Sequence, residues 1–212
     1  MAKKTIIIID CETNGLDSEE FSVLSASAIK FTFDTETKKS EVISEFDRYY
    51  YPKENWYNRS AIQVNSLDKE NIDLKRRDVE YAEFFIDDKD WDNYIKGADI
   101  FVGHNIEYFD SKFMLDGRTE KKIEEFDMIC TMILNIFEVK AEFEYPTPSD
   151  YSPYKYPSLY ETAKFYGVDF DFRKLHGSLY DCQVVFEIFK KMVDKGLLNK
   201  ELGIEQKIAE NL

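Results

Sequence analysis

The 212-residue sequence is 43% hydrophobic and contains 17 phenylalanines, a composition that argues against a disordered chain. It has 42 acidic and only 28 basic residues, and the net charge of -14 argues against a protein that binds long duplex DNA through a basic surface. The charge does not exclude contact with phosphates through bound divalent cations, which can invert the electrostatics of an acidic cleft.

Neither a membrane span nor a secretion signal is predicted. The apolar runs fall well short of the ~20 residues that cross a bilayer, and the N-terminal run soon meets Asp10. The three cysteines, Cys11, Cys130 and Cys182, are widely spaced and form no CxxC pair, so neither a disulfide framework nor a zinc site is indicated. We therefore expect a cytoplasmic protein that contacts no membrane.

The first half of the chain predicts most of a sheet. Thr5–Asp10 is short, β-branched and ended by polar residues, as in a buried strand. Val23–Phe33 and Glu41–Tyr51 follow, separated by the polar turn "DTETKK", so the first three strands form an antiparallel meander. The segment "ADIFVGHN" at 98–105 adds a fourth, short buried strand.

Helical spacing of apolar residues dominates the rest of the sequence. The predicted helices cover Asp78–Ile95, Asp110–Asp116, Asp127–Val139, Ser158–Tyr166 and Ser178–Lys195. Ser158 is followed three residues later by Glu161, which matches a capping box at a helix start. Strands first and helices later, with one strand between, indicate an α/β fold.

The segment Glu142–Pro157 is predicted to be a loop, because it holds four of the five prolines and four tyrosines. Two interpretations stay open. The tyrosines could form a flap near a substrate, since aromatic rings stack on nucleic-acid bases without sequence preference. Alternatively, the segment is a rigid connector packed by its own rings.

Two carboxylates end the first strand. Asp10 and Glu12 are two residues apart and therefore point to the same face if the strand continues. Two anions held close together raise the pKa of one of them unless a cation lies between them, and oxygen ligands suit magnesium or manganese. The alternative is an exposed strand end whose acids face water, with Asp10 or Asn14 starting a turn.

The fourth strand also runs into polar residues. His104 and Asn105 end it, and Asp110 follows shortly after. Ligands of open α/β sheets bind beyond the carboxyl ends of the strands, so these residues would face the same crevice as the first two carboxylates. Taken singly, Asp110 could be a helix N-cap, a metal ligand or both.

A third acid-bearing segment, "HGSLYD", opens the last predicted helix. Asp181 falls on its first turn and His176 on the loop before it. A carboxylate near a helix N-terminus is stabilised there whether or not it has another role. However, the chain has only two histidines, His104 and His176, and each lies in one of the acid-bearing segments.

Together these segments resemble the DnaQ-like 3′-to-5′ exonucleases of the DEDD superfamily, in its histidine-bearing DEDDh branch. "DCETNGL" is similar to the first motif of that family, "GHNIEYFD" to the second and "HGSLYD" to the third. The resemblance extends over about Thr5–Lys195. It implies a ribonuclease H-like α/β fold with a five-stranded mixed sheet, antiparallel in strands one to three and then parallel, flanked by helices. The exonuclease domain would cover 1–198, including the loop at 142–157, and a charged tail would cover 199–212.

The resemblance also implies roles for single residues. Asp10, Glu12, Asp110 and Asp181 would hold two Mg²⁺ or Mn²⁺ ions, with Asp10 bridging them. His176 would be the general base that activates water. The implied substrate-binding residues are Thr13, Asn14, Gly15, Leu16, His104, Asn105, Phe109 and Arg173, with Leu16 wedged against the terminal base. Arg173 and the neighbouring Lys174 are equally well explained as a solvated basic pair.

One departure concerns the second motif. Three residues separate Asn105 from Phe109, whereas many bacterial proofreading subunits have two, and the longer spacing resembles other branches of the superfamily. Asp116 is therefore kept as an alternative to Asp110.

The expected activity is hydrolysis of DNA from single-stranded or frayed 3′ ends, releasing nucleoside 5′-monophosphates in proofreading or repair. The substrate would reach the enzyme directly or through a polymerase or other delivery partner. A 3′-5′ exoribonuclease is the main alternative, because the metal chemistry is indifferent to the sugar. A non-catalytic binding module and a cysteine hydrolase using Cys11 with His176 are weaker alternatives, the latter because it leaves four acids unexplained.

Overall fold

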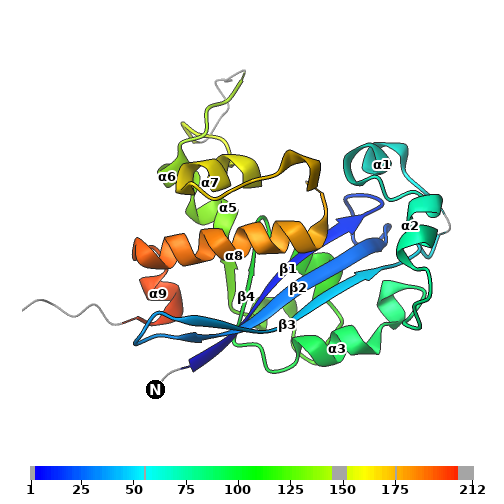
Figure 1. Cartoon of the computed structure of the whole chain (residues 1–212), viewed down its shortest axis with the longest axis horizontal. Helices are drawn as coiled ribbons and strands as arrows, with labels where there is room; N and C mark the ends of the chain where they lie inside the picture. The colour runs from blue at the N-terminus through cyan, green and yellow to red at the C-terminus, as the bar shows by residue number, and fades with distance from the viewer. Residues whose placement is uncertain (1–2, 55, 145–151, 175, 205–212) are drawn as a thin grey trace, which may run out of the picture.

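A computed structural model describes residues 3–54, 56–144, 152–174 and 176–204. In it, a five-stranded mixed sheet has helices on both faces (Figure 1). The strands are β1 (Lys3–Thr13), β2 (Val23–Asp34), β3 (Ser40–Tyr49), β4 (Ile100–Gly103) and β5 (Met128–Cys130), in the spatial order β3-β2-β1-β4-β5. β1 pairs antiparallel with β2, and β2 with β3, whereas β4 pairs parallel with β1 and β5 parallel with β4. The predicted fold class is confirmed.

The helices differ greatly in length. They are α1 (Arg59–Asn65), α2 (Lys69–Lys75), α3 (Lys89–Ile95), α4 (Asp110–Met114), α5 (Thr131–Leu134), α6 (Ile136–Val139), α7 (Leu159–Tyr166), α8 (Ser178–Asp194) and α9 (Asn199–Leu202). Short 3-10 turns lie at Phe85–Asp87, Ile123–Glu125 and Phe172–Lys174. Among the described residues, none of these helices is long and apolar enough to cross a bilayer.

β1 is buried on both faces of the sheet. Ile6 and Ile8 pack toward α8, which runs across one face (Figure 1), while Ile7 and Ile9 pack toward α3 and α4 on the other. All four isoleucines are fully buried, which explains an unbroken apolar run where a half-exposed strand would alternate. Asp10, the next residue on the Ile6 and Ile8 face, is thereby directed toward α8.

The helix predicted over Asp78–Ile95 is wrong in its first part. Residues 78–84 are not helical, a 3-10 turn covers Phe85–Asp87, and α3 begins only at Lys89. The reason is Asp88, whose side chain accepts hydrogen bonds from the backbone N–H groups of Asp90 and Trp91 and so caps α3.

The helix predicted over Asp127–Val139 is also wrong at its start. Met128–Cys130 forms β5 and pairs with β4, and two short helices follow instead of one. The break falls at Asn135, whose buried side-chain amide donates to the carbonyl of Thr131 at 2.7 Å. Such local bonds compete with the regular helical pattern. Helices α1 and α2 were not predicted at all.

The predicted capping box at α7 is confirmed. The Ser158 hydroxyl accepts from the Glu161 N–H at 3.2 Å, and the Glu161 carboxylate accepts from the Ser158 N–H at 2.8 Å. Of the proline- and tyrosine-rich loop, residues 145–151 lie outside the described part. The span predicted as a tail begins with α9, whose Leu202 is fully buried in the core beside α8.

Candidate metal and active site

The acid-bearing segments meet at the carboxyl ends of β1 and β4. A cavity of about 430 Å³ opens there. Its lining includes the predicted carboxylates and both histidines: Asp10, Glu12, Asp110, Asp181, His104 and His176, together with Asn105 and Phe109. One ligand atom from each of Glu12, His176 and Asp181 lies within 4.8 Å of the others. The surface explanation, in which the two acids of β1 merely face water, does not hold for this arrangement.

Asp110 occupies the first position of α4 and is buried. The N-cap position belongs to Phe109 and has no side-chain cap bond, so the N-cap interpretation of Asp110 is wrong. The Asp110 carboxylate accepts instead from the backbone N–H of Cys11 at 3.1 Å, which ties α4 to β1. Asp116 is exposed and lines a different cavity beside Lys112, so the structure favours Asp110 as the site residue.

Burial shifts the pKa values of all four carboxyls upward, and repulsion by neighbouring carboxylates adds to the shift at Asp10, Glu12 and Asp181. Burial, then the charges of Asp110, Asp181 and Glu12, raises the pKa of Asp10 well above its usual value. Burial and the charges of Asp181 and Asp110 raise the pKa of Glu12 to about 8. The pKa values of Asp110 and Asp181 are each raised to about 7, chiefly by burial. Without a cation, this cluster retains protons at neutral pH.

The cluster fits a divalent metal ion. Four carboxylates offer oxygen ligands of the kind that Mg²⁺ and Mn²⁺ prefer. The Oδ1 atom of Asp181 is buried and has no hydrogen-bond partner among the described residues. Buried polar atoms are normally paired. A cation would supply the missing partner and would also oppose the upward pKa shifts.

His176 lies at the open edge of the cluster. Its Nδ1 atom is 4.0 Å from Oε1 of Glu12, and 44% of its side chain is exposed. Partial burial lowers the pKa of His176, so the ring is neutral at pH 7. Its φ of 61° is uncommon for a residue with a side chain, and it turns the chain into α8 just before Ser178.

A buried hydroxyl network supports the start of α8 and was not predicted. The Ser178 hydroxyl lies 2.5 Å from that of Ser25 and 2.7 Å from that of Ser27, and Ser27 donates to Asp47 at 2.8 Å. These bonds join α8 to β2 three residues before Asp181. The small residues "SASA" in an otherwise bulky strand are the sequence signal that could have indicated a close approach.

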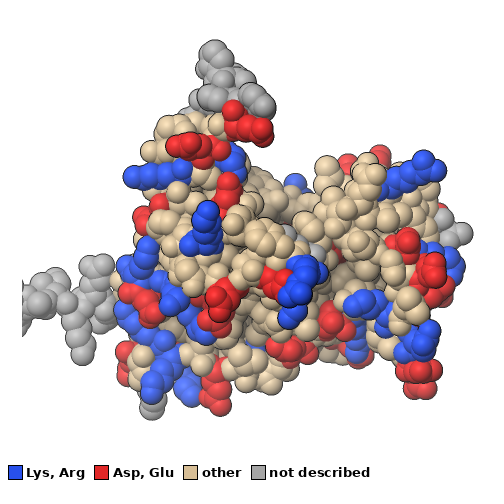
Figure 2. Space-filling model, turned by 45° about the horizontal axis from the view of Figure 1, so that its top comes forward, with Lys and Arg blue, Asp and Glu red and all other residues tan. Residues whose placement is uncertain are grey.

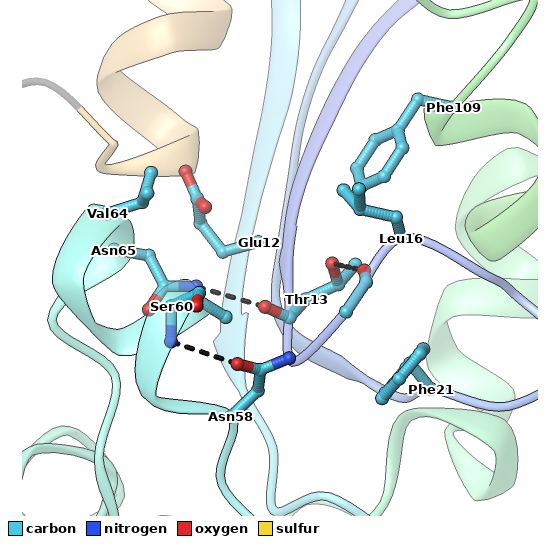
Figure 3. Close-up of a pocket in the computed structure, with 11 residues that line it drawn as sticks. Glu12, Thr13, Leu16, Phe21, Asn58, Ser60, Val64, Asn65 and Phe109 are labelled. Atoms are coloured by element: carbon cyan, nitrogen blue, oxygen red, sulfur yellow. Dashed lines mark hydrogen bonds between the residues drawn. The ribbon is translucent and has the colours of Figure 1, made fainter.

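A second, largely apolar pocket of about 510 Å³ adjoins the first and shares Glu12 and Phe109 with it (Figure 3). Leu16, Phe21 and Val64 provide further apolar walls. In the space-filling view, a hollow separates the part built by α6 and α7 from the part built by α1 and α2 (Figure 2). Most of the visible walls of this hollow carry neither acidic nor basic side chains.

The first motif forms one side of the apolar pocket. Leu16 projects into solvent with 85% of its surface exposed, and the Thr13 hydroxyl donates to the Gly15 carbonyl at 2.5 Å. A side chain at Gly15 would come within 2.2 Å of the Phe21 ring, so only glycine fits. Asn14 is buried, with its amide donating to the Trp56 carbonyl at 3.0 Å and its carbonyl accepting from the Ser22 N–H.

The remaining predicted substrate contacts divide into two groups. Asn105 and Phe109 line the acidic cavity, as does His104. His104 is held through its ring nitrogens, 2.9 Å from the Pro157 carbonyl and 3.1 Å from the Thr131 hydroxyl, and burial lowers its pKa to about 4. Arg173 lines neither cavity; it pairs with Asp171 at 2.9 Å and is 88% exposed.

Cys11 does not fit the role of a nucleophile. The thiol is buried and lies 3.5 Å from Oδ1 of Asp110. Burial, followed by the negative charges of Asp110, Asp10 and Glu12, raises the pKa of this thiol well above its usual value. The thiolate that a cysteine hydrolase requires is therefore disfavoured.

The sheet is ribonuclease H-like, and four carboxylates and a histidine meet at its edge. These features are typical of the nucleases that share this fold. A family model described as Exonuclease (RNase T) matches residues 7–189. The chain therefore belongs to this exonuclease family, and the resemblance to DnaQ-like enzymes of the DEDD superfamily is confirmed. No curated relative matches the sequence.

Solved structures share the fold at low sequence identity. The zinc-bound complex of exonuclease I from E. coli with single-stranded DNA matches with a TM-score of 0.62 and 12% identity over 92% of this chain. Exonuclease I from Methylocaldum szegediense gives 0.64 and 15% over 92%. Cell-death related nuclease 4 gives 0.54 and 14% over 91% of this chain and 64% of its own. This chain spans 42% of the length of either exonuclease I.

Proposed function

We propose that the protein is a metal-dependent 3′-5′ exonuclease that removes nucleotides from single-stranded or frayed DNA ends and releases nucleoside 5′-monophosphates. The observation that carries this proposal is the meeting of four carboxylates, two buried and two partly buried, with His176 in one cavity, directly beside a pocket of a size and polarity suited to one nucleotide. The matching E. coli exonuclease I structures contain single-stranded DNA or oligonucleotides, which supports this substrate class.

Asp10, Glu12, Asp110 and Asp181 would hold two Mg²⁺ or Mn²⁺ ions. When bound, such ions lower the pKa of water and stabilise charge on phosphoryl and leaving oxygens. The protein's contribution is to hold the ligands in place: the Cys11 N–H fixes Asp110, and the buried hydroxyl network fixes the start of α8, which carries Asp181.

His176 would act as the general base. A neutral imidazole can accept a proton from water, and the lowered pKa of His176 keeps it neutral at physiological pH. Its partial exposure lets water reach the ring, while Glu12 lies 4.0 Å from its Nδ1 atom. The proton taken from water by His176 leaves a hydroxide that can attack the phosphorus of the terminal phosphodiester. The bond from that phosphorus to the 3′ oxygen of the preceding nucleotide would then break, and this oxygen would take up a proton from the protonated His176 or from water.

The apolar pocket would hold the 3′-terminal nucleotide. Leu16 and Phe109 stand close together on one side of it (Figure 3), where their side chains could separate the terminal base from its neighbour. Glu12 lines both cavities, so the sugar of a terminal nucleotide in the apolar pocket would lie next to the carboxylates. Each reaction would therefore remove one nucleotide.

Net charge and cysteine chemistry suggest a cellular setting. The net charge of -14 favours short single strands over long duplexes, or delivery of the substrate by a polymerase or basic protein. The three free, buried cysteines fit a reducing compartment such as the cytoplasm. Proofreading or repair would then be the role.

The proposal is tested by a time course on three 5′-labelled substrates: single-stranded DNA, duplex DNA with a mismatched 3′ end, and RNA. We expect stepwise shortening of single-stranded DNA from the 3′ end, abolished by EDTA and restored by Mg²⁺ or Mn²⁺. Faster cleavage of RNA would identify an exoribonuclease instead. Intact substrates in the presence of both metals would overturn the proposal and leave a binding module.

A further inference from the structure

The strand that carries Asp10 and Glu12 is irregular where it reaches the site. Glu12 pairs with Ser25 on β2, but the next residue, Thr13, pairs with Val23, so Leu24 has no opposite residue on β1. Bulges of this kind bend the strands and re-aim side chains, and they occur often beside active sites. The direction of the Glu12 side chain thus depends on what fixes the peptide that follows it.

Asn65, the last residue of α1, fixes that peptide. Its side-chain amide donates to the Thr13 carbonyl at 3.1 Å, across 52 residues of sequence (Figure 3). Its side-chain oxygen accepts from the Leu67 N–H at 3.0 Å. Asn65 is only 8% exposed. Because both ends of the amide have backbone partners, its orientation is determined.

We propose that Asn65 is a positioning residue, which holds Glu12 in the geometry required for metal binding by pinning the Thr13 carbonyl at the bulge. This inference rests on the proposed function, in which Glu12 is a metal ligand. Partners that orient metal ligands typically change metal affinity or activity by about 10- to 100-fold when they are removed. Helix α1, absent from the sequence predictions, thereby becomes part of the metal site as well as a wall of the apolar pocket.

The test compares Asn65→Leu, which keeps the branched shape of the side chain and fills the site, with Asn65→Ala, which empties it; both remove the donor. Asn71→Ala is the matched control. Its exposed amide donates to the Ser66 carbonyl at 2.8 Å in the same region of the chain, and it lines neither cavity. Two quantities are measured at temperatures where thermal melts show folded protein: Mn²⁺ binding by calorimetry without nucleic acid, and the Mg²⁺ concentration that gives half-maximal cleavage of single-stranded DNA.

Both Asn65 variants should need about 10- to 100-fold more metal in each measurement, while the Asn71 control stays at the wild-type value. Unchanged metal dependence in the two variants, or a change in only one of them, would overturn the inference, because the effect would then be absent or due to volume. An inactive wild type that still binds Mn²⁺ would refute the proposed function, whereas calorimetry would continue to test Asn65.

Discussion

Two groups of buried or partly buried carboxylates in this protein have opposite electrostatics. Asp88, 2% exposed, meets Arg48 at 2.8 Å and the Tyr50 hydroxyl at 2.7 Å. Burial raises the pKa of Asp88, but hydrogen bonds from Tyr50 and Arg48 outweigh burial and bring this pKa below its usual value. At the end of β1, by contrast, Asp10 and its neighbours have mainly one another, and their pKa values rise.

The difference separates a structural network from a functional one. The charge of Asp88 is balanced within the chain, and its side chain caps α3 besides, so this network is complete without a ligand. The carboxylates of the cavity are balanced by no cationic side chain among the residues that line it. Removing one carboxylate should therefore have opposite effects on stability in the two places.

The largest effect is expected from Asp10→Ala. If Asp10 holds the metal ions, its loss forfeits several kcal/mol of transition-state stabilisation, or about 10³-fold in rate. The measurement is the rate of nucleotide release from single-stranded DNA in Mg²⁺. Glu187→Ala, which removes one acid from the exposed side of α8, is the control and should cleave at the wild-type rate. Full activity of Asp10→Ala would remove the acidic cluster from the mechanism.

Asp88→Asn should destabilise the protein without touching the site. The change removes the buried charge that faces Arg48 and leaves the guanidinium with the exposed Asp90 alone. We expect a cost of about 2 to 4 kcal/mol, less than for a buried charge that loses its only partner. For a domain of this size we expect a fall in Tm of roughly 5 to 15 °C. The metal dependence of the folded variant should match that of wild type. An unchanged Tm would mean that the Asp88 network is no more stabilising than a surface pair.

His176→Ala tests whether the edge of the cluster performs chemistry or only binds. Loss of a general base typically lowers the rate by about 10²-fold or more. The variant should still bind Mn²⁺ in calorimetry, because the four carboxylates remain. A wild-type rate at saturating Mg²⁺ would limit His176 to a structural role at the start of α8.

The sequence predicts the residues of the site more completely than it predicts the helices and strands around them. Asp10, Glu12, Asp110, His176 and Asp181 carry recognisable spacing, and the four isoleucines before Asp10 predict a central strand. These signals are local in sequence, and the structure brings the five residues to one cavity as the motifs imply.

The missed features depend on distant contacts. β5 is only three residues long, and its strand character comes from pairing with β4. Helix α1 has seven residues, few apolar ones, and a role that appears only when Asn65 meets Thr13. The role of Arg173 stays a prediction: the residue pairs with Asp171 at 2.9 Å on the surface, a contact that a solvated basic residue and a phosphate-binding one could both make.

Asp110→Asn should have the smallest effect, a change in the free energy of unfolding whose sign distinguishes a metal ligand from a structural carboxylate. Asparagine keeps an oxygen that can accept from the Cys11 N–H, but it removes one negative charge from the cluster. In EDTA at pH 7.5 we expect the variant to be more stable than wild type by about 1 to 3 kcal/mol, the reverse of Asp88→Asn. Urea unfolding would measure the difference.

The pH dependence of that difference follows from the sign of the shift. The pKa of Asp110 is about 7 in the folded protein and lies near 3.8 when the chain unfolds, so the folded state binds the extra proton between these values. Below pH 4 the carboxyl therefore leaves the free energy of unfolding unchanged, and as the pH rises from 4 through 7 it lowers that free energy increasingly. In metal-free buffer, wild type and Asp110→Asn should have equal stability near pH 4 and diverge toward pH 7.5. Saturating Mg²⁺ should reverse their order at pH 7.5, because a ligand that binds the folded state stabilises wild type more. A variant that is less stable than wild type in EDTA at pH 7.5 would show that Asp110 serves the fold, as Asp88 does, rather than a cation.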